Sequence, residues 1–162
     1  MDFIEYSTTW AKSEVTQGRI MIGIGLLLLV ALYFIFRSNH ELLRGAMVPM
    51  SLLALVLVGY GGFILQSRPA HSKASIELFQ QSPDDAVAQE KMKHINDNKA
   101  GKTLMKWVYP SLIILSIVIL MLISSFYYKG MALGFVFLFA AIYIMDYGFV
   151  SRSDAFLKFL EG

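Results

Sequence analysis

The chain has 162 residues, of which 56% are hydrophobic and only 16% charged, whereas about 25% of a soluble domain is charged. Its net charge of +2 is too small to indicate a nucleic-acid partner. Its lack of cysteine excludes disulfides, thiolate metal sites and thiol–disulfide exchange. This composition predicts a single membrane domain that covers residues 1–162.

Four long apolar stretches, each flanked by Lys or Arg, follow one another along the chain. They cover residues 20–36, 46–65, 107–128 and 130–150. Crossing about 30 Å of hydrocarbon takes roughly 20 helical residues, with about 17 at the lower limit. We therefore expect an all-α polytopic membrane protein with four transmembrane helices, arranged as two hairpins. The first 19 residues contain three acids and no cleavage motif, so we expect the first helix to remain in the mature protein.

The cations are divided unequally between the two sides of the membrane. Of the 14 Lys and Arg residues, eleven lie in residues 1–19, 66–106 and 151–162. The other three, Arg37, Arg44 and Lys129, lie at the short connections on the opposite side. Because cytoplasmic segments carry the excess of Lys and Arg, we expect both termini and the middle segment to be cytoplasmic.

The two halves of the chain are similar to each other. Arg44-Gly45 opens the second stretch as Lys129-Gly130 opens the fourth, and Gly62-Phe63 matches Gly148-Phe149 near their ends. Parallel repeats of this kind occur in some transporters. Any membrane hairpin has basic flanks, however, so the sequence leaves open whether the likeness is a true duplication.

The segment between the second and third stretches has a strong helix start at Ser82-Pro83-Asp84-Asp85. Ser can cap a helix, Pro suits its first turn, and acids favour the positive end of its dipole. We expect a cytoplasmic helix over about residues 83–96, which Asn98 and Gly101 can end. Its thin apolar stripe consists of Ala88, Met92 and Ile95.

Two further amphipathic segments lie next to the predicted spans. The N-terminus has Phe3, Tyr6 and Trp10 on one helical side, and the C-terminal tail has Phe156 and Phe159 around Lys158. Apolar faces with flanking Lys are typical of helices that lie along a bilayer surface. These short helices either brace the bundle at the headgroup level or dock to a partner or to anionic lipid.

Asp146 stands out as an ionisable residue within a predicted span, about four residues from its cytoplasmic end. A carboxylate in a spanning helix is costly and often functional. Tyr143 and Tyr147 flank it at helical spacing, and Tyr60 should lie at a similar depth. These four residues predict an intramembrane polar site for a proton or a cation, unless Asp146 simply reaches water or pairs with Arg152.

Small residues recur at seven-residue spacing on two of the predicted spans. They are Ala54 and Gly61 on the second span, and Gly134, Ala141 and Gly148 on the fourth. Small residues on one seam let membrane helices approach closely. We therefore expect these positions to serve helix packing.

The sequence gives no indication of catalysis, a metal or a cofactor. His40, His71 and His94 all lie outside the spans, which excludes a haem held by two histidines within the membrane. No nucleophile elbow, phosphate-binding loop or dinucleotide fingerprint occurs. We interpret His94, with Glu90 and Asp97, as a surface cluster and expect a non-enzymatic protein.

Several short motifs resemble a known group of proteins. They are Ile4-Glu5-Tyr6-Ser7, Trp10-Ala11-Lys12-Ser13-Glu14 with Gly18, Ser82-Pro83, and Met105-Lys106-Trp107 before the third stretch. Together they resemble uncharacterised small four-span proteins of the bacterial inner membrane. The resemblance implies an inner-membrane location, and it carries no known activity or site residues.

Two functions remain open from the sequence. The first is a non-enzymatic role by assembly, as an accessory subunit or a homo-oligomeric scaffold. Its partners would be the lipid bilayer and either another copy of the chain or another membrane protein. The alternative is a small transporter or channel protomer that uses Asp146 as an ion or proton site.

Overall fold

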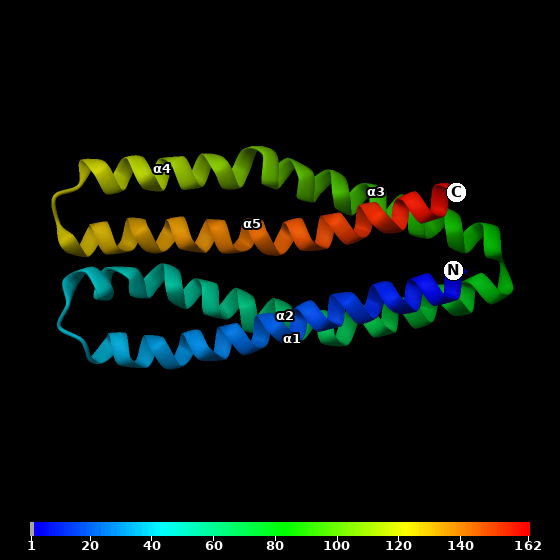
Figure 1. Ribbon diagram of the computed structural model, residues 1–162, viewed down its shortest axis with the longest axis horizontal. Coiled ribbons are helices and arrows are strands. Elements are labelled where there is room, and N and C mark those ends of the chain that lie inside the picture. Colours follow the sequence, from blue (N-terminus) through cyan, green and yellow to red (C-terminus); the bar gives the residue numbers. More distant parts are fainter. Residues whose placement is uncertain (1) are drawn as a thin grey trace.

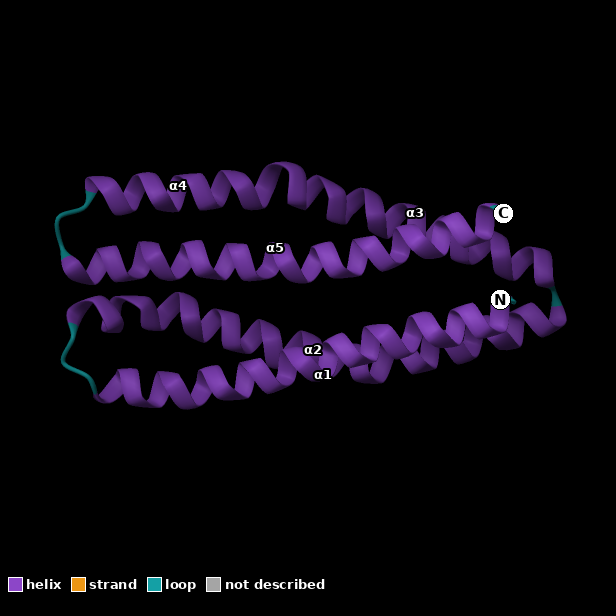
Figure 2. Ribbon diagram, viewed as in Figure 1, coloured by secondary structure: helices purple, strands orange, loops and turns teal. Residues whose placement is uncertain are grey.

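The computed structural model describes residues 2–162, which form long helices joined by short connections (Figures 1 and 2). The helices are α1 (Phe3–Arg37), α2 (Glu41–Gln81), α3 (Pro83–Thr103), α4 (Tyr109–Leu122) and α5 (Phe126–Glu161). A π-helical segment, η1 (Leu104–Val108), joins α3 to α4 without a break. The prediction of an all-α fold is confirmed.

Four continuous rods are long and apolar enough to cross a membrane: α1, α2, α3–η1–α4 and α5. The third predicted stretch, residues 107–128, extends too far along the chain. The chain turns at residues 123–125, and α5 already begins at Phe126. Serine is unfavourable within a helix and favoured at a helix start, and Ser125 is the N-cap residue of α5.

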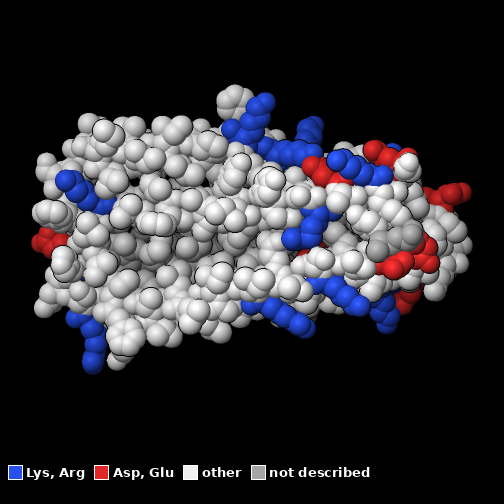
Figure 3. All heavy atoms as spheres, in the orientation of Figure 1, with Lys and Arg blue, Asp and Glu red and all other residues white. Residues whose placement is uncertain are grey.

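The rods are much longer than a bilayer is thick. At 1.5 Å per residue, the 41 residues of α2 extend roughly 60 Å, about twice the hydrocarbon thickness. One half of the molecule carries few charges except near its tip, whereas the other carries most of them (Figure 3). We call residues 20–65 and 107–150 the apolar half, and residues 3–19, 66–106 and 151–161 the charged half.

The helices of the charged half continue the long axis of the apolar half. The expectation of short helices that lie along the membrane surface is therefore wrong. The N-terminal segment is part of α1, the C-terminal tail is part of α5, and both ends lie near the same tip (Figure 1). Phe3, Trp10 and Phe156 belong to one buried cluster, and the Phe3 ring stacks on Phe79 at 4.3 Å. This shared core, rather than a bilayer surface, covers the aromatic faces.

In the apolar half the helices lie in the order α1, α2, α5, α4 (Figure 1). Within the described residues, α4 packs against α5 and touches neither α1 nor α2. The buried residues of α4 are Tyr109 and Ser116. Most of its apolar surface is therefore free for lipid or for another protein.

The interface between α2 and α5 is reciprocal at the tip of the apolar half. A Cβ on Gly45 would collide with the backbone carbonyl of Tyr127, and a Cβ on Gly130 would collide with that of Leu42. Gly134 lies against Pro49. The same sequence offset relates Gly45 to Gly130, Leu42 to Tyr127 and Pro49 to Gly134. This reciprocity supports the hairpin repeat suggested by the sequence.

The small residues of the predicted seams lie where helices meet. A Cβ on Gly61 would lie 2.8 Å from the carbonyl oxygen of Gly18, and one on Gly148 would lie 2.9 Å from the Gln17 side chain. Gly134 faces α2, as described above. Ala54 is buried, and Ala141 packs against the buried cluster of the apolar half.

Candidate functional site

The polar part of the interior lies in the charged half, next to its boundary with the apolar half. Its buried members include Glu14, Ser72, Ser75, Glu90, His94, Asn98 and Ser153. Their partners are Arg68, His71, Arg152 and Asp154. We call these residues the polar core. Buried charges are costly unless they are paired, so the pairing decides what the polar core does.

Glu14 of α1 is the centre of one group and is only 1% exposed. Its carboxylate accepts a hydrogen bond from Arg152 Nε at 2.7 Å, and Arg68 Nε lies 3.4 Å from its other oxygen. Arg152 also donates to the side-chain oxygen of Gln17. Burial raises the pKa of Glu14, although both arginines oppose the shift. One carboxylate thus joins α1, α2 and α5.

Glu90 of α3 is the centre of a second group. His71 Nε2 lies 2.8 Å from one of its oxygens, and His94 Nε2 lies 3.4 Å from the other. His94 Nδ1 lies 2.5 Å from Ser153 Oγ. Burial favours a higher pKa for Glu90, but the two histidines outweigh it and hold the pKa below its ordinary value. This group joins α2, α3 and α5.

Helix α3 turns a polar face inward and an apolar face outward. Its buried residues recur every fourth position and are Ala86, Glu90, His94 and Asn98. The predicted apolar stripe faces outward, with Met92 67% and Ile95 47% exposed. The interpretation of Glu90 and His94 as a surface cluster is therefore wrong. A hydropathy pattern cannot reveal a polar face whose burial is compensated by ion pairs.

Asn98 and Gly101 dock α3 on α5 instead of ending it near Asn96. Asn98 donates a hydrogen bond to Asp154 at 2.7 Å. A Cβ on Gly101 would lie 2.6 Å from Val150 Cγ2, so the absence of a side chain allows the two helices to approach closely. Helix α3 continues to Thr103 and passes through η1 into α4.

Trp10 lies between the two carboxylate groups. Its ring centroid is 5.2 Å from that of His94 and 6.1 Å from that of His71, both edge-on. The Arg68 guanidinium and the Lys93 ammonium lie 5.4 and 5.5 Å from the Trp10 ring centroid. Burial lowers the pKa of Lys93. Trp10 therefore combines aromatic packing with two cation–π contacts.

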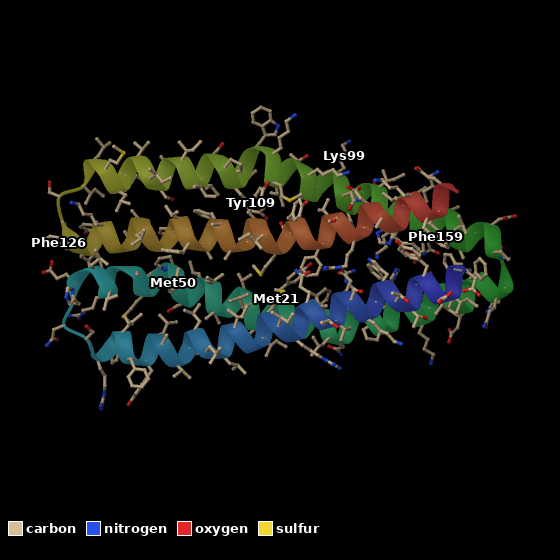
Figure 4. The ribbon with its side chains drawn as sticks, viewed as in Figure 1. Met21, Met50, Lys99, Tyr109, Phe126 and Phe159 are labelled. Carbon is tan, nitrogen blue, oxygen red and sulfur yellow. The ribbon has the colours of Figure 1, made fainter. Side chains whose placement is uncertain are left out.

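A cavity of about 320 Å³ adjoins the polar core where the charged half meets the apolar half. Its lining residues include Trp10, Glu14, Tyr60, Arg68, Asp97 and Asp146. Asp146 accepts a hydrogen bond from the Tyr109 hydroxyl at 2.5 Å. The side chain of Tyr109 extends from α4 toward α5 (Figure 4).

The structure brings together part of the predicted intramembrane site. Asp146 and Tyr60 line the same cavity. Tyr143 and Tyr147 are 37% and 61% exposed, and neither is hydrogen-bonded to Asp146. The hydroxyl that donates to Asp146 belongs instead to Tyr109 of α4. Tyr109 comes close to Asp146 only because α4 packs against α5.

Arg152 does not pair with Asp146, because Glu14 and Gln17 hold its guanidinium. Sequence reasoning did not select Glu14 as a site residue, although a signal was present. Glu14 follows Trp10 by one helical turn and so extends the aromatic face of the N-terminal segment. An acid on an otherwise apolar face indicates a buried partner on another helix.

Within residues 2–162, no group of three or more His, Asp or Glu side chains is arranged to hold a metal ion. Comparisons with family models, with curated proteins and with solved structures found no match to the chain. The fold itself defines the class of protein. This is a multi-pass membrane protein with four spanning rods and a polar core at one end.

Proposed function

We propose that this protein acts non-enzymatically by assembly, as an accessory subunit or a homo-oligomeric scaffold in the membrane. One observation carries the proposal, namely the outward apolar stripe of α3. Met92 and Ile95 are exposed in the charged half, outside the predicted spans. Exposed apolar patches outside the membrane are typical of interaction sites.

The same rod offers an apolar surface within the membrane. Helix α4 continues from α3 and packs against α5 alone among the described helices of the apolar half. Ile114, Leu115 and Met121 of α4 are 61%, 54% and 80% exposed. A partner that packs along the α3–η1–α4 rod would cover apolar surface in both halves of the molecule.

The polar core supports this role by holding the rod in place. Glu90 and His94 dock α3 against α2 and α5, and Asn98 attaches it to Asp154. The exposed stripe therefore lies on a rigid support. Preorganisation of this kind lowers the entropic cost of binding a partner.

The proposal includes a location, the bacterial inner membrane with both termini in the cytoplasm. The excess of Lys and Arg in the charged half supports this orientation. The resemblance to small four-span proteins of the bacterial inner membrane supports the location.

Native purification in mild detergent, followed by mass spectrometry of the intact species, tests the assembly role. We expect either a stoichiometric companion protein or a homo-oligomer, and the double variant Met92→Gln/Ile95→Gln should release it. The control variant Ala74→Gln changes an exposed residue of α2 and should leave the assembly intact. A wild-type protein that is monomeric and without a companion would contradict the proposal.

A second candidate is a small transporter or channel protomer, and the position of Asp146 beside the cavity favours it. In that case Asp146→Asn should abolish flux in liposomes while the protein still folds. A scaffold with the same substitution should lose only stability or nothing. Full flux in the variant, in a working assay, would exclude Asp146 as the ion or proton site.

A further inference from the structure

The cavity beside the polar core contains hydrogen-bond donors that the described residues leave unused. Trp10 Nε1 and Arg68 Nε are buried and have no hydrogen-bond partner there, although Arg68 is within ion-pair range of Glu14. Both residues line the cavity, and Trp10 is only 6% exposed. Indole and guanidinium nitrogens can donate but not accept. Since buried donors are rarely left without partners, they indicate a ligand with acceptor oxygens.

The same cavity also carries negative charge. Asp97 and Asp146 line it, together with Glu14, which already has two arginine partners. Asp97 is exposed and forms no ion pair within the described residues. These carboxylates disfavour a simple anion. A ligand that combines a phosphate with an ammonium group matches both the donors and the carboxylates.

The position of the cavity suits the headgroup of a lipid. Tyr60 and Asp146 belong to the apolar half, whereas Trp10 and Arg68 belong to the charged half. The cavity therefore lies across the level at which the headgroups meet the hydrocarbon. Phe137, Ile144 and Tyr147 of α5 are 59%, 69% and 61% exposed, so α5 offers apolar surface along which an acyl chain can lie.

We propose that the cavity binds the headgroup of a phospholipid that carries a primary amine. The phosphate accepts hydrogen bonds from Trp10 and Arg68, and the ammonium faces Asp97 and Asp146. The volume of about 320 Å³ is close to the lower end of the range of small-ligand sites, roughly 300–1,000 Å³. A bound headgroup would connect four helices at the membrane surface. This site is independent of the proposed assembly role.

Native mass spectrometry of the full chain, released from nanodiscs that contain equal amounts of phosphatidylethanolamine and phosphatidylglycerol, tests the proposal. We expect one tightly retained phosphatidylethanolamine per chain, favoured about tenfold over phosphatidylglycerol, which lacks the amine. Equal retention of the two lipids, or retention of neither, would overturn the proposal.

Two variants locate the site without removing its ion pairs. Asp97→Asn changes an exposed side chain, and Trp10→Phe keeps an aromatic ring but removes the indole N–H. Each should lower retention about fivefold or more. Asp84→Asn, a matched change on α3 outside the cavity lining, should have no effect. If both variants retain the lipid as the wild type does, with circular dichroism showing all chains folded, the cavity is not the site.

Water-soluble glycerophosphoethanolamine distinguishes a lipid from a free ligand. If it binds the lipid-free protein only weakly while phosphatidylethanolamine is retained, the ligand is the lipid, as we propose. If it binds as tightly and displaces the lipid, the phosphate–amine chemistry holds but the ligand is soluble, and the lipid assignment is overturned.

Discussion

Glu14 and Arg152 are 138 positions apart in the sequence, yet Arg152 Nε donates a hydrogen bond to the Glu14 carboxylate at 2.7 Å. The pair joins the first helix to the last just outside the predicted hydrocarbon region. Because Arg68 approaches the same carboxylate from α2, a single buried acid holds three helices together.

Arg152→Gln should be strongly destabilising. Without the guanidinium, Glu14 keeps a single cationic partner, Arg68 at 3.4 Å. Leaving a buried charge undercompensated costs about 3 kcal/mol, which chemical denaturation in detergent at neutral pH can measure. The loss should be smaller in acid, because burial already raises the pKa of Glu14 and its carboxylate, without Arg152, can take up a proton.

Lys73→Gln is the control for this prediction. Lys73 and Glu77 form an ion pair on the exposed surface of α2, and such pairs contribute at most about 1 kcal/mol. The double variant Arg152→Gln/Glu14→Gln should recover much of the lost stability, because it removes the carboxylate that Arg68 alone compensates incompletely. Equal losses for Arg152→Gln and Lys73→Gln would show that the Glu14 pair is not structural.

Glu90→Gln should change the pH dependence of stability. The pKa of Glu90 is lower in the folded protein than its ordinary value of 4.5, so its ionisation stabilises the fold above about pH 4.5. This contribution is lost progressively as the pH falls further. The difference in Tm between wild type and Glu90→Gln should therefore shrink as the pH falls below about 4.5.

Glu77→Gln, a change of an exposed acid, is the control for Glu90 and should give a small difference in Tm at every pH. If the difference between wild type and Glu90→Gln does not decrease in acid, the histidines do not stabilise the ionised Glu90.

Gly45→Ala and Gly130→Ala should weaken the α2–α5 interface. In each case the added Cβ meets a backbone carbonyl of the other helix, which cannot move like a flexible side chain. We expect a loss of about 1–3 kcal/mol, measured by thermal unfolding in detergent.

Gly23→Ala and Gly59→Ala are matched controls, because nothing lies within 4 Å of a Cβ at either position. Alanine is the better helix former by about 1 kcal/mol, so these variants should be neutral or slightly more stable. Losses as large as those at Gly45 and Gly130 would contradict the close packing of α2 and α5.

The orientation can be measured because the chain has no cysteine of its own. Asn39→Cys places a thiol in the connection between α1 and α2, and Ser82→Cys places one between α2 and α3. A membrane-impermeant maleimide should label position 39 in intact cells and position 82 only after permeabilisation. The reverse pattern would invert the proposed orientation.

The spanning rods could be predicted because the hydropathy of a segment reflects its free energy of membrane insertion, and basic flanks mark where such a segment ends. The start of α3 was also predictable, since Ser82 is its N-cap residue and Pro83 opens its first turn, although the Ser82 hydroxyl donates to Asp85 and does not cap the backbone. The end of that helix was not. Asn98 and Gly101 are typical helix terminators, but here the Asn98 amide donates a hydrogen bond to Asp154, and the lack of a side chain at Gly101 lets Val150 of α5 approach.

The polar core was harder to predict, for a physical reason. Glu14, Glu90 and His94 are buried only because residues far along the chain compensate their burial. The hydropathy pattern of a single helix predicts that such residues face water. Asp146 was recognised because an acid in an apolar stretch is costly within a membrane, whereas its partner Tyr109 depends on how α4 packs against α5.

The measurement that tests assembly most directly is cross-linking of a single cysteine in native membranes. Met92→Cys places the thiol on the outward apolar stripe of α3, and Ala74→Cys places a control on the exposed surface of α2. With a short reagent that joins a maleimide to a photoreactive diazirine, which captures a partner with or without cysteine, we expect a discrete product of higher mass from position 92 and only monomer from position 74. Monomer alone from position 92, at full thiol modification, would contradict the assembly role.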